Sequence, residues 1–180
     1  MQEFPLDKAY TWIEPGPVVL VTTFDKGRAN VMTMSWHQML EFMPPVMSCC
    51  LGPWDFSYEA LRKTGECVIA IPTVDLAQKV VDIGNVSGRD VDKFAKFGLT
   101  ALPAGQVAAP LIAECVANLE CTLVDRMDKY EINILEVVRA WHDPDRAERR
   151  TLHHYGDGTF VIDGEKIDLR KRMVKWQEVG

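Results

Sequence analysis

The sequence predicts a mainly β protein, a small antiparallel barrel that carries short helices. Segments rich in β-branched and apolar residues recur along the chain and are separated by turns that contain glycine or proline. Only two of the segments between them are clearly helical, and both are short. The regular alternation of strand and helix that builds a doubly wound parallel sheet is missing, whereas a barrel of antiparallel strands accommodates this order.

The totals predict one folded domain that covers residues 1–180. A chain of 180 residues is long enough to bury a core without disulfides or a metal. Apolar residues make up 47% of it and charged residues 26%, which is a globular composition rather than that of a disordered chain.

The first elements are strands. Residues 18–24 and 29–35 favour extended structure, and Asp25-Lys26-Gly27 between them predicts the turn of a β-hairpin. Pro44-Pro45 excludes a helix or a central strand at that point. The apolar residues 46–51, bounded by Gly52-Pro53, then predict the next strand.

Two short helices flank a buried strand. Ser57 is the expected N-cap of a helix over residues 58–63, which Gly65 ends. Residues 67–71 then form a strand. Thr73 is the expected cap of a second helix, whose apolar side chains recur at helical spacing as far as Gly84.

The second half begins with a polar stretch, residues 85–92, and one or two helical turns within residues 91–97. Residues 98–113 are an expected loop, and connections of that length are unusual unless they have a role. Residues 115–123 alternate between apolar and mostly polar positions, which predicts a half-buried strand. Two further strands are expected, over residues 130–140 and, after a polar turn, over residues 159–162.

Charge and hydropathy exclude two classes of partner. The formal net charge of −6 argues against binding to nucleic acid, which requires clustered positive potential. The uncharged runs 42–54 and 97–113 are too short to cross a membrane, and prolines interrupt them. The N-terminus lacks the pattern of a secretory signal, so we expect a cytoplasmic protein.

The spacing of the cysteines and histidines in the sequence does not match a metal-binding motif. The five cysteines contain no Cys-x-x-Cys pair and are expected to be core residues in a reducing compartment. Cys49 and Cys50 on one strand point to opposite faces, which disfavours a disulfide between them. His153 and His154 are also neighbours, so on a strand their side chains would point to opposite faces and could not bind one metal together. No metal is therefore expected.

The familiar catalytic motifs are missing from the sequence, including the dinucleotide and phosphate loops and the nucleophile elbow. What remains is residues 30–36, Ser57, and Ser87-Gly88-Arg89 followed by Lys93, which together suit a phosphate and a polar heterocycle. A purely structural explanation stays open, in which Ser57 caps a helix, Ser87-Gly88 turns the chain, and Trp36 is buried in a strand.

Four blocks resemble one known family. They are the sequences of residues 30–36 (Asn-Val-Met-Thr-Met-Ser-Trp), Pro44-Pro45, residues 64–72 (Thr-Gly-Glu-Cys-Val-Ile-Ala-Ile-Pro) and residues 87–94 (Ser-Gly-Arg-Asp-Val-Asp-Lys-Phe). In this order and with these gaps they resemble the flavin reductase-like, FMN-binding split-barrel proteins, in particular the flavoredoxin branch. The resemblance covers roughly residues 12–140.

The resemblance implies an antiparallel split β-barrel, a homodimer with FMN near the subunit interface, and an oxidoreductase that transfers reducing equivalents from NAD(P)H to or through the flavin. Because the flavin carries the redox chemistry, no catalytic side chain is expected. Carried over by position, the residues expected along the ring and ribityl chain are Asn30, Thr33, Met34, Ser35 and Trp36, with Leu51 and Ser57 nearby and Ser87, Arg89 and Lys93 at the phosphate.

The sequence departs from the family at a motif associated with the nicotinamide. Many flavin reductases carry Gly-Asp-His where this chain has Asp128-Lys129-Tyr130, and a later glycine is replaced by Leu135. The departure keeps two alternatives open: an NAD(P)H-dependent reductase, or an FMN-binding electron-transfer protein that is reduced by a protein partner. A third is a barrel that has lost its flavin site, against which the polar residues at the phosphate end argue.

Overall fold

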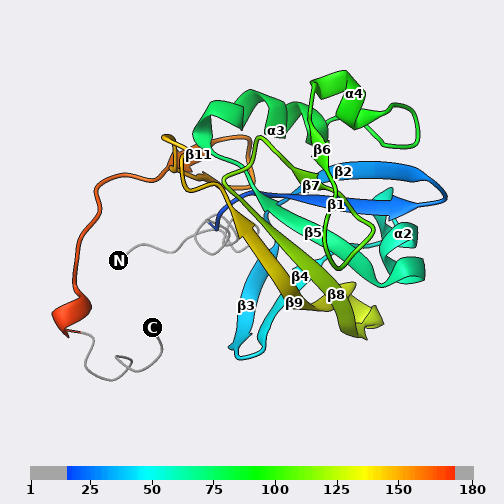
Figure 1. Ribbon diagram of the computed structural model, residues 1–180, viewed down its shortest axis with the longest axis horizontal. Helices are drawn as coiled ribbons and strands as arrows, with labels where there is room; N and C mark the ends of the chain where they lie inside the picture. The colour runs from blue at the N-terminus through cyan, green and yellow to red at the C-terminus, as the bar shows by residue number, and fades with distance from the viewer. Residues whose placement is uncertain (1–15, 173–180) are drawn as a thin grey trace, which may run out of the picture.

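A seven-stranded antiparallel sheet forms the body of the protein, in a computed structural model that describes residues 16–172 (Figure 1). The strand order is β2-β1-β5-β8-β9-β4-β3. The strands are β1 (Val19–Asp25), β2 (Arg28–Met34), β3 (His37–Phe42), β4 (Pro45–Cys50), β5 (Glu66–Ile71), β8 (Ala117–Met127) and β9 (Ile132–His142). The predicted mainly β architecture is confirmed.

The sheet curls into a barrel that is split along one side. Its two edge strands, β2 and β3, follow each other in the chain, and only Ser35 and Trp36 separate them. Because so short a link spans at most about 11 Å, the two edges of the sheet must approach each other there. The edges are not paired in the sheet, so the fold is the split β-barrel that the resemblance implied.

Within residues 16–172, three short α-helices cover the sheet: α2 (Ser57–Thr64), α3 (Ala77–Gly84) and α4 (Lys93–Phe97). Helices α3 and α4 pack on β2, and α2 packs on β1 (Figure 1). Helix α2 ends at Gly65, whose φ of 69° is left-handed as the sequence predicts. Asp92 caps α4 by accepting a hydrogen bond from the Ala95 amide at 3.1 Å.

One predicted helix cap is wrong, and the other is confirmed in position only. The N-cap of α2 is Phe56, and Ser57 is the first helical residue, because its hydroxyl is engaged by side chains of β1 and β2. Thr73 is the N-cap of a 3-10 turn, η2 (Val74–Leu76), which leads directly into α3, but its hydroxyl donates to the Asp75 carboxylate and makes no capping bond to a backbone amide.

The β1–β2 hairpin is confirmed, and its turn residues Lys26 and Gly27 have φ angles of 50° and 77°. Strand β3 was not predicted. Five of its six residues are exposed, so no burial imposes the alternating pattern by which strands are recognised in a sequence.

The polar face of β8 is covered rather than solvated. Glu120 and Asn118 are 0% and 6% exposed, because the segment predicted as a plain loop folds back over them. That segment contains a small sheet of β6 (Ala101–Leu102) and β7 (Leu111–Ile112). The amides of Gly105 and Val107 donate to the Glu120 carboxylate at 2.9 and 3.1 Å, so a buried carboxylate holds the long connection in place.

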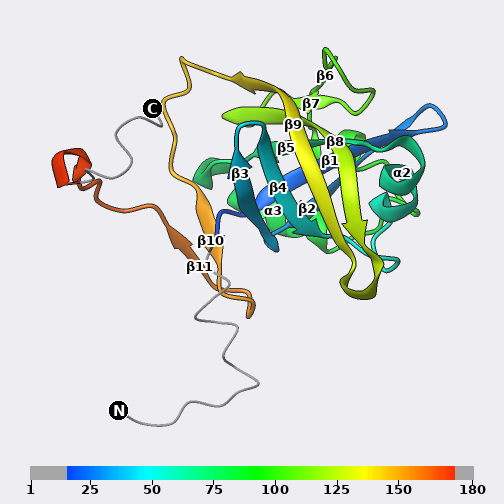
Figure 2. The same ribbon diagram turned by 90° about the horizontal axis from the view of Figure 1, so that it is seen from below.

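A second hairpin, β10 (Leu152–His154) and β11 (Phe160–Ile162), lies beside the barrel, and β10 was not predicted. The Val18 amide donates to the Leu152 carbonyl at 2.7 Å, which ties the hairpin to the start of β1. As predicted, the two histidines diverge: His153 bonds Asp163, whereas His154 stacks on Phe160. Residues 163–169 then run away from the barrel, and a last 3-10 turn, η4 (Arg170–Arg172), follows (Figure 2).

The core of the described residues has three clusters, and the two largest lie on opposite faces of the sheet. Val18, just before β1, and Leu20, within it, face α3 and α4. Val19 and Val21, which alternate with them along the strand, face the barrel interior. Cys49 is buried and Cys50 half-buried, as predicted for neighbours on one strand. Among residues 16–172, no helix has the length and apolar character needed to span a bilayer.

Candidate functional site

A polar cavity of about 290 Å³ lies between β2, the start of α2 and the segment that joins α3 to α4. Four predicted site residues line it: Asn30, Thr33, Ser87 and Lys93. The other lining residues are Met32, Trp54, Asp55, Phe56, Gly84, Asn85, Val86 and Gly88. Residues more than 50 positions apart in sequence thus meet at one site.

A second cavity of about 390 Å³, the strand-end cavity, continues from the first at the end of β2. It is lined by Val18, Thr33, Met34, Ser35, Val80, Val81, Gly84, Asn85, His154, Gly158 and Phe160. Thr33, Gly84 and Asn85 line both cavities, which therefore form one groove. The Thr33 hydroxyl donates to the Val80 carbonyl at 2.6 Å and fixes α3 against β2 along this groove.

Lys93 supplies a buried positive charge to the polar cavity. It is 5% exposed, and its Nζ donates to the Ile83 carbonyl at 2.9 Å. Burial lowers the pKa of Lys93, and the nearby Asp55 carboxylate opposes that shift. An ammonium group has three hydrogens, and a carbonyl does not neutralise its charge, so Lys93 can still donate to an anion in the cavity.

Asp55 faces the same cavity. Burial raises the pKa of Asp55, and the Gly52 amide, which donates to Oδ2 at 3.2 Å, and the Lys93 charge partly offset this effect. The two ionisable groups therefore shift each other toward the charged forms. The sequence did not predict Asp55 or its neighbours Trp54 and Phe56 as site residues. These three residues form no recognisable binding motif, and a turn of the backbone brings them to the cavity.

Ser57 and Leu51 lie behind the groove rather than along it. Ser57 is fully buried, and its hydroxyl accepts hydrogen bonds from Asn30 Nδ2 at 2.9 Å and Thr23 Oγ1 at 3.2 Å. This fixes the Asn30 amide, whose oxygen faces Gly88. Leu51 is fully buried in the barrel core. Both residues can position the lining, and neither lines a cavity itself.

Arg28, which was not predicted, holds the segment that carries Ser87. Its guanidinium lies 5.5 Å from the centre of the Phe56 ring and donates to the carbonyls of Gly88 and Val91, the latter at 3.1 Å. An isolated arginine after a hairpin turn gives no signal in the sequence. Its role follows from the approach of the β1–β2 hairpin to a segment 60 residues away.

Two further predicted residues, in addition to Ser57 and Leu51, lie outside both cavities. Trp36 is 60% exposed, which also contradicts the alternative of a buried tryptophan, and Arg89 is exposed beside Ser87. Both adjoin the groove in sequence: Trp36 follows Ser35, and Arg89 follows Gly88.

The donor set of the groove suits a phosphorylated heterocycle. A buried ammonium, the Ser87 hydroxyl and the Asn85 amide at the polar cavity match an anion. The strand-end cavity offers Val80, Val81 and Phe160 as apolar walls, with hydroxyls and an amide along one side. The cradle is tight at Gly88, where a Cβ atom would collide with Asn30 Oδ1 and lie 2.6 Å from the Phe56 ring.

This close approach predicts the effect of Gly88→Ala. The added methyl group must displace Asn30 or Phe56, and overpacking of this kind costs about 1–3 kcal/mol. We expect FMN affinity, measured by fluorescence titration, to fall about 5- to 150-fold. Gly164→Ala, whose Cβ meets open space, is the control and should leave affinity unchanged. Equal affinities of the two variants would show that the cradle is not part of the site.

Comparisons with known proteins identify the family of the chain. The flavin reductase like domain model matches residues 13–162. The Escherichia coli (strain K12) protein "Uncharacterized protein YddH" is 33% identical over 178 residues, which cover 90% of this chain and 94% of that protein. An FMN-binding domain of a flavin reductases-like enzyme from Shewanella baltica OS155 has a TM-score of 0.79 and 30% identity, covering 92% of this chain and 95% of that one. Flavoredoxin of Desulfovibrio vulgaris (Miyazaki F) has a TM-score of 0.79 and 25% identity, covering 86% and 90%. The chain belongs to the flavin reductase-like family, as its four sequence blocks indicated.

Proposed function

We propose that this chain is a single flavin reductase-like domain over residues 1–180 that binds FMN in the groove and works as a flavin-dependent oxidoreductase. In this function it transfers reducing equivalents from NAD(P)H to or through the flavin. The observation that carries the proposal is the buried Lys93 ammonium at one end of a continuous groove that has apolar walls at its other end. The FMN-binding protein of Shewanella baltica supports the identity of the ligand.

The residues divide by their place along the groove. Lys93 and Ser87 would hold the phosphate, with Arg89 next to them in the chain. Asn30 and Thr33 would contact the ribityl chain, and Met34 and Ser35 would lie along the ring, with Trp36 at its exposed edge. FMN supplies the electron-transfer chemistry when it is bound, so the side chains need only bind it, orient it and exclude water.

The second candidate is an FMN-binding electron carrier, reduced by a partner protein and not by a nicotinamide. The observation in its favour is the turn at η3 (Asp128–Tyr130), which replaces the Gly-Asp-His motif. There the Lys129 ammonium lies 5.0 Å from the centre of the Tyr130 ring, and Tyr130 is 57% exposed. A lysine and an exposed tyrosine thus stand where many flavin reductases have aspartate and histidine.

One experiment separates the two candidates. The protein is gel-filtered after incubation with FMN, and its visible spectrum is recorded before and after anaerobic addition of NADH and then NADPH. Bleaching of the bound flavin by either nicotinamide supports the reductase. Bound flavin that stays oxidised with both supports the electron carrier, and elution without flavin contradicts FMN binding.

We further propose a homodimer formed through β3. Trp36, Met39, Leu40, Phe42 and Met43 are all between 46% and 86% exposed, and β3 is an open edge of the sheet. Large apolar side chains gathered on one edge strand are typical of an interface. The position of Ser35 and Trp36, between the groove and this strand, would place the flavin near the partner subunit.

The double variant Phe42→Asp, Met43→Asp is therefore expected to be monomeric, because two charges cannot be buried unpaired in an apolar interface. Light scattering after gel filtration measures the mass. Leu102→Asp, at an exposed apolar position on β6, is the control and should keep the dimer mass. A monomer mass for the unchanged protein would contradict the proposed dimer.

The cytoplasm is the proposed location. All five cysteines are free thiols in the structure, four of them buried, which suits a reducing compartment. Fractionation of cells that produce the protein tests this, and recovery outside the cytoplasmic fraction would contradict it.

A further inference from the structure

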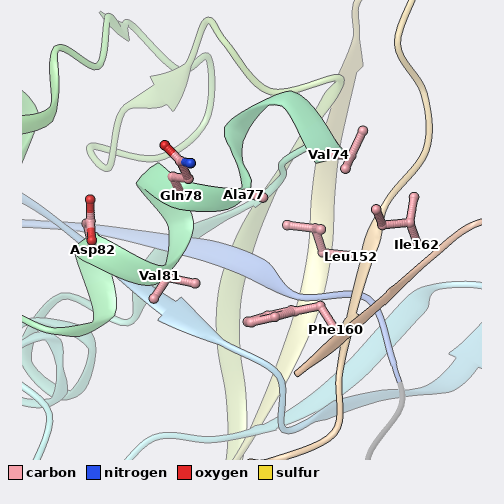
Figure 3. A pocket seen from close by; sticks show the side chains of 8 residues that line it. All are labelled: Val74, Ala77, Gln78, Val81, Asp82, Leu152, Phe160 and Ile162. Carbon is pink, nitrogen blue, oxygen red and sulfur yellow. The ribbon is translucent and has the colours of Figure 1, made fainter. Parts of the chain in front are cut away.

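A third cavity, of about 420 Å³, lies between α3 and the β10–β11 hairpin (Figure 3). We call it the apolar cavity. It is lined by Val74, Ala77, Gln78, Val81, Asp82, Leu152, Phe160 and Ile162. Figure 3 shows Val81 and Ala77 of α3 across from Leu152, Phe160 and Ile162 of the hairpin side. Its volume is within the range of small-molecule sites, roughly 300–1,000 Å³.

The lining determines which molecules fit. Six of the eight side chains are apolar, and the two polar ones, Gln78 and Asp82, are one helical turn apart on α3. The eight lining residues include a carboxylate and no cation. An anionic ligand would therefore meet only like charge, whereas a neutral apolar molecule could pack between the walls and accept a hydrogen bond from the Gln78 amide.

The apolar cavity adjoins the groove that we assign to FMN. Val81 and Phe160 line both the apolar cavity and the strand-end cavity, where the ring end of FMN is placed. The opposite end of the groove, at Lys93, is the phosphate end. A molecule in the apolar cavity would therefore be next to the redox-active part of the cofactor and distant from its charged part.

We propose that the apolar cavity binds the electron acceptor, and that this acceptor is a small, neutral, planar molecule of the quinone class. The proposal rests on the proposed function. Reduction of a quinone to its hydroquinone takes up two electrons and two protons, which fully reduced FMN releases as it returns to the oxidised form. Both carbonyl oxygens become hydroxyls, and no atom group is transferred. The two ends of α3 thus line different sites. Gly84 at its end, with Asn85 after it, borders the cofactor groove, and Ala77 and Gln78 at its start border the apolar cavity.

The first test uses binding to the flavin-free protein, with duroquinone (tetramethyl-1,4-benzoquinone) as the probe in calorimetric titration. Ala77→Phe places a ring in the cavity and is expected to weaken duroquinone binding at least about tenfold, while FMN affinity stays unchanged. Lys79→Phe adds the same ring to α3 at a position that lines none of the three cavities and should leave duroquinone affinity unchanged. Equal duroquinone affinities of Ala77→Phe and the unchanged protein would overturn the proposal.

The second test uses charge and does not alter packing, since Asp82 is exposed. The anionic probe 1,4-naphthoquinone-2-sulfonate should bind the unchanged protein at least about tenfold more weakly than duroquinone, and Asp82→Lys should tighten it several-fold without affecting duroquinone. No response to Asp82→Lys would overturn the assignment. Duroquinone affinity that falls as protein concentration rises would show that a second copy of the chain covers the cavity instead.

The outcomes distinguish this proposal from the proposed function. If FMN binds and duroquinone does not, the acceptor assignment fails and the flavin function stands. If duroquinone binds and responds to Ala77→Phe while FMN does not bind, the cavity is a ligand site and the flavin function fails. Steady-state reduction of duroquinone by the FMN-loaded protein should show a raised KM in Ala77→Phe with FMN content unchanged.

Discussion

Lys93→Ala is expected to weaken FMN binding about 10- to 150-fold and to leave riboflavin binding nearly unchanged. The ammonium is 5% exposed at the polar cavity, so its contact with a phosphate would be shielded from water. A charge-assisted hydrogen bond of this kind contributes about 1.5–3 kcal/mol. Riboflavin lacks the phosphate, so the ratio of the two dissociation constants, measured by fluorescence titration, isolates this interaction.

The control for this variant is Lys96→Ala on the same helix. Lys96 is exposed and lines neither cavity of the groove, so both flavins should bind as they do to the unchanged protein. Ser57→Ala should weaken both flavins alike, because Asn30, which would contact the ribityl chain common to both, loses the acceptor that orients it. If Lys93→Ala weakened both flavins equally, the phosphate would be elsewhere in the groove.

Glu120→Gln is expected to lower the free energy of unfolding by about 3 kcal/mol. The carboxylate is fully buried and accepts hydrogen bonds from the amides of residues 105–107 and from the Trp141 indole at 2.6 Å. A glutamine amide replaces one acceptor oxygen with a donor, which leaves donors facing each other. In a chain of this length the midpoint of thermal unfolding should fall by roughly 6–12 °C.

The direction of the Glu120 pKa shift determines how the stability of the protein changes with pH. Burial alone would raise the pKa of Glu120, but the backbone amides and the Trp141 indole outweigh it, and the pKa lies below its usual value of 4.5. A lowered folded-state pKa means that the carboxylate stabilises the protein above about pH 4.5. This stabilisation is lost as the pH falls from 4.5 through the folded-state pKa.

Chemical unfolding at several pH values between 3 and 7 measures this contribution. Glu120→Gln should be less stable than the unchanged protein at pH 7, and the difference should narrow on acidification below pH 4.5. Glu165→Gln, at an exposed position, is the control and should follow the unchanged protein. A difference that stays constant with pH would show that the charge of Glu120 is not what holds the segment.

Much of the fold follows from local signals. The β1–β2 hairpin was predicted because Lys26-Gly27 takes the left-handed turn that joins twisted strands. Gly65 ends α2 for a similar reason. Burial is not local, however: the alternation along β8 placed Glu120 on a polar face, yet a segment 13 to 15 residues away covers it.

The sequence by itself determined the strands with one buried face, the C-terminal ends of α2 and α3, the family, and four residues that line the polar cavity: Asn30, Thr33, Ser87 and Lys93. These features could be predicted because they depend either on a pattern of neighbouring residues or on motifs that follow one another in a fixed order along the chain. Only the tertiary structure decided that Arg28 holds the Gly88 segment, that Ser57 lies behind Asn30, and that α3 borders both the groove and the apolar cavity. The reason is physical: these roles depend on the curl of the sheet, which joins residues distant in the chain, and a local pattern carries no information about such contacts.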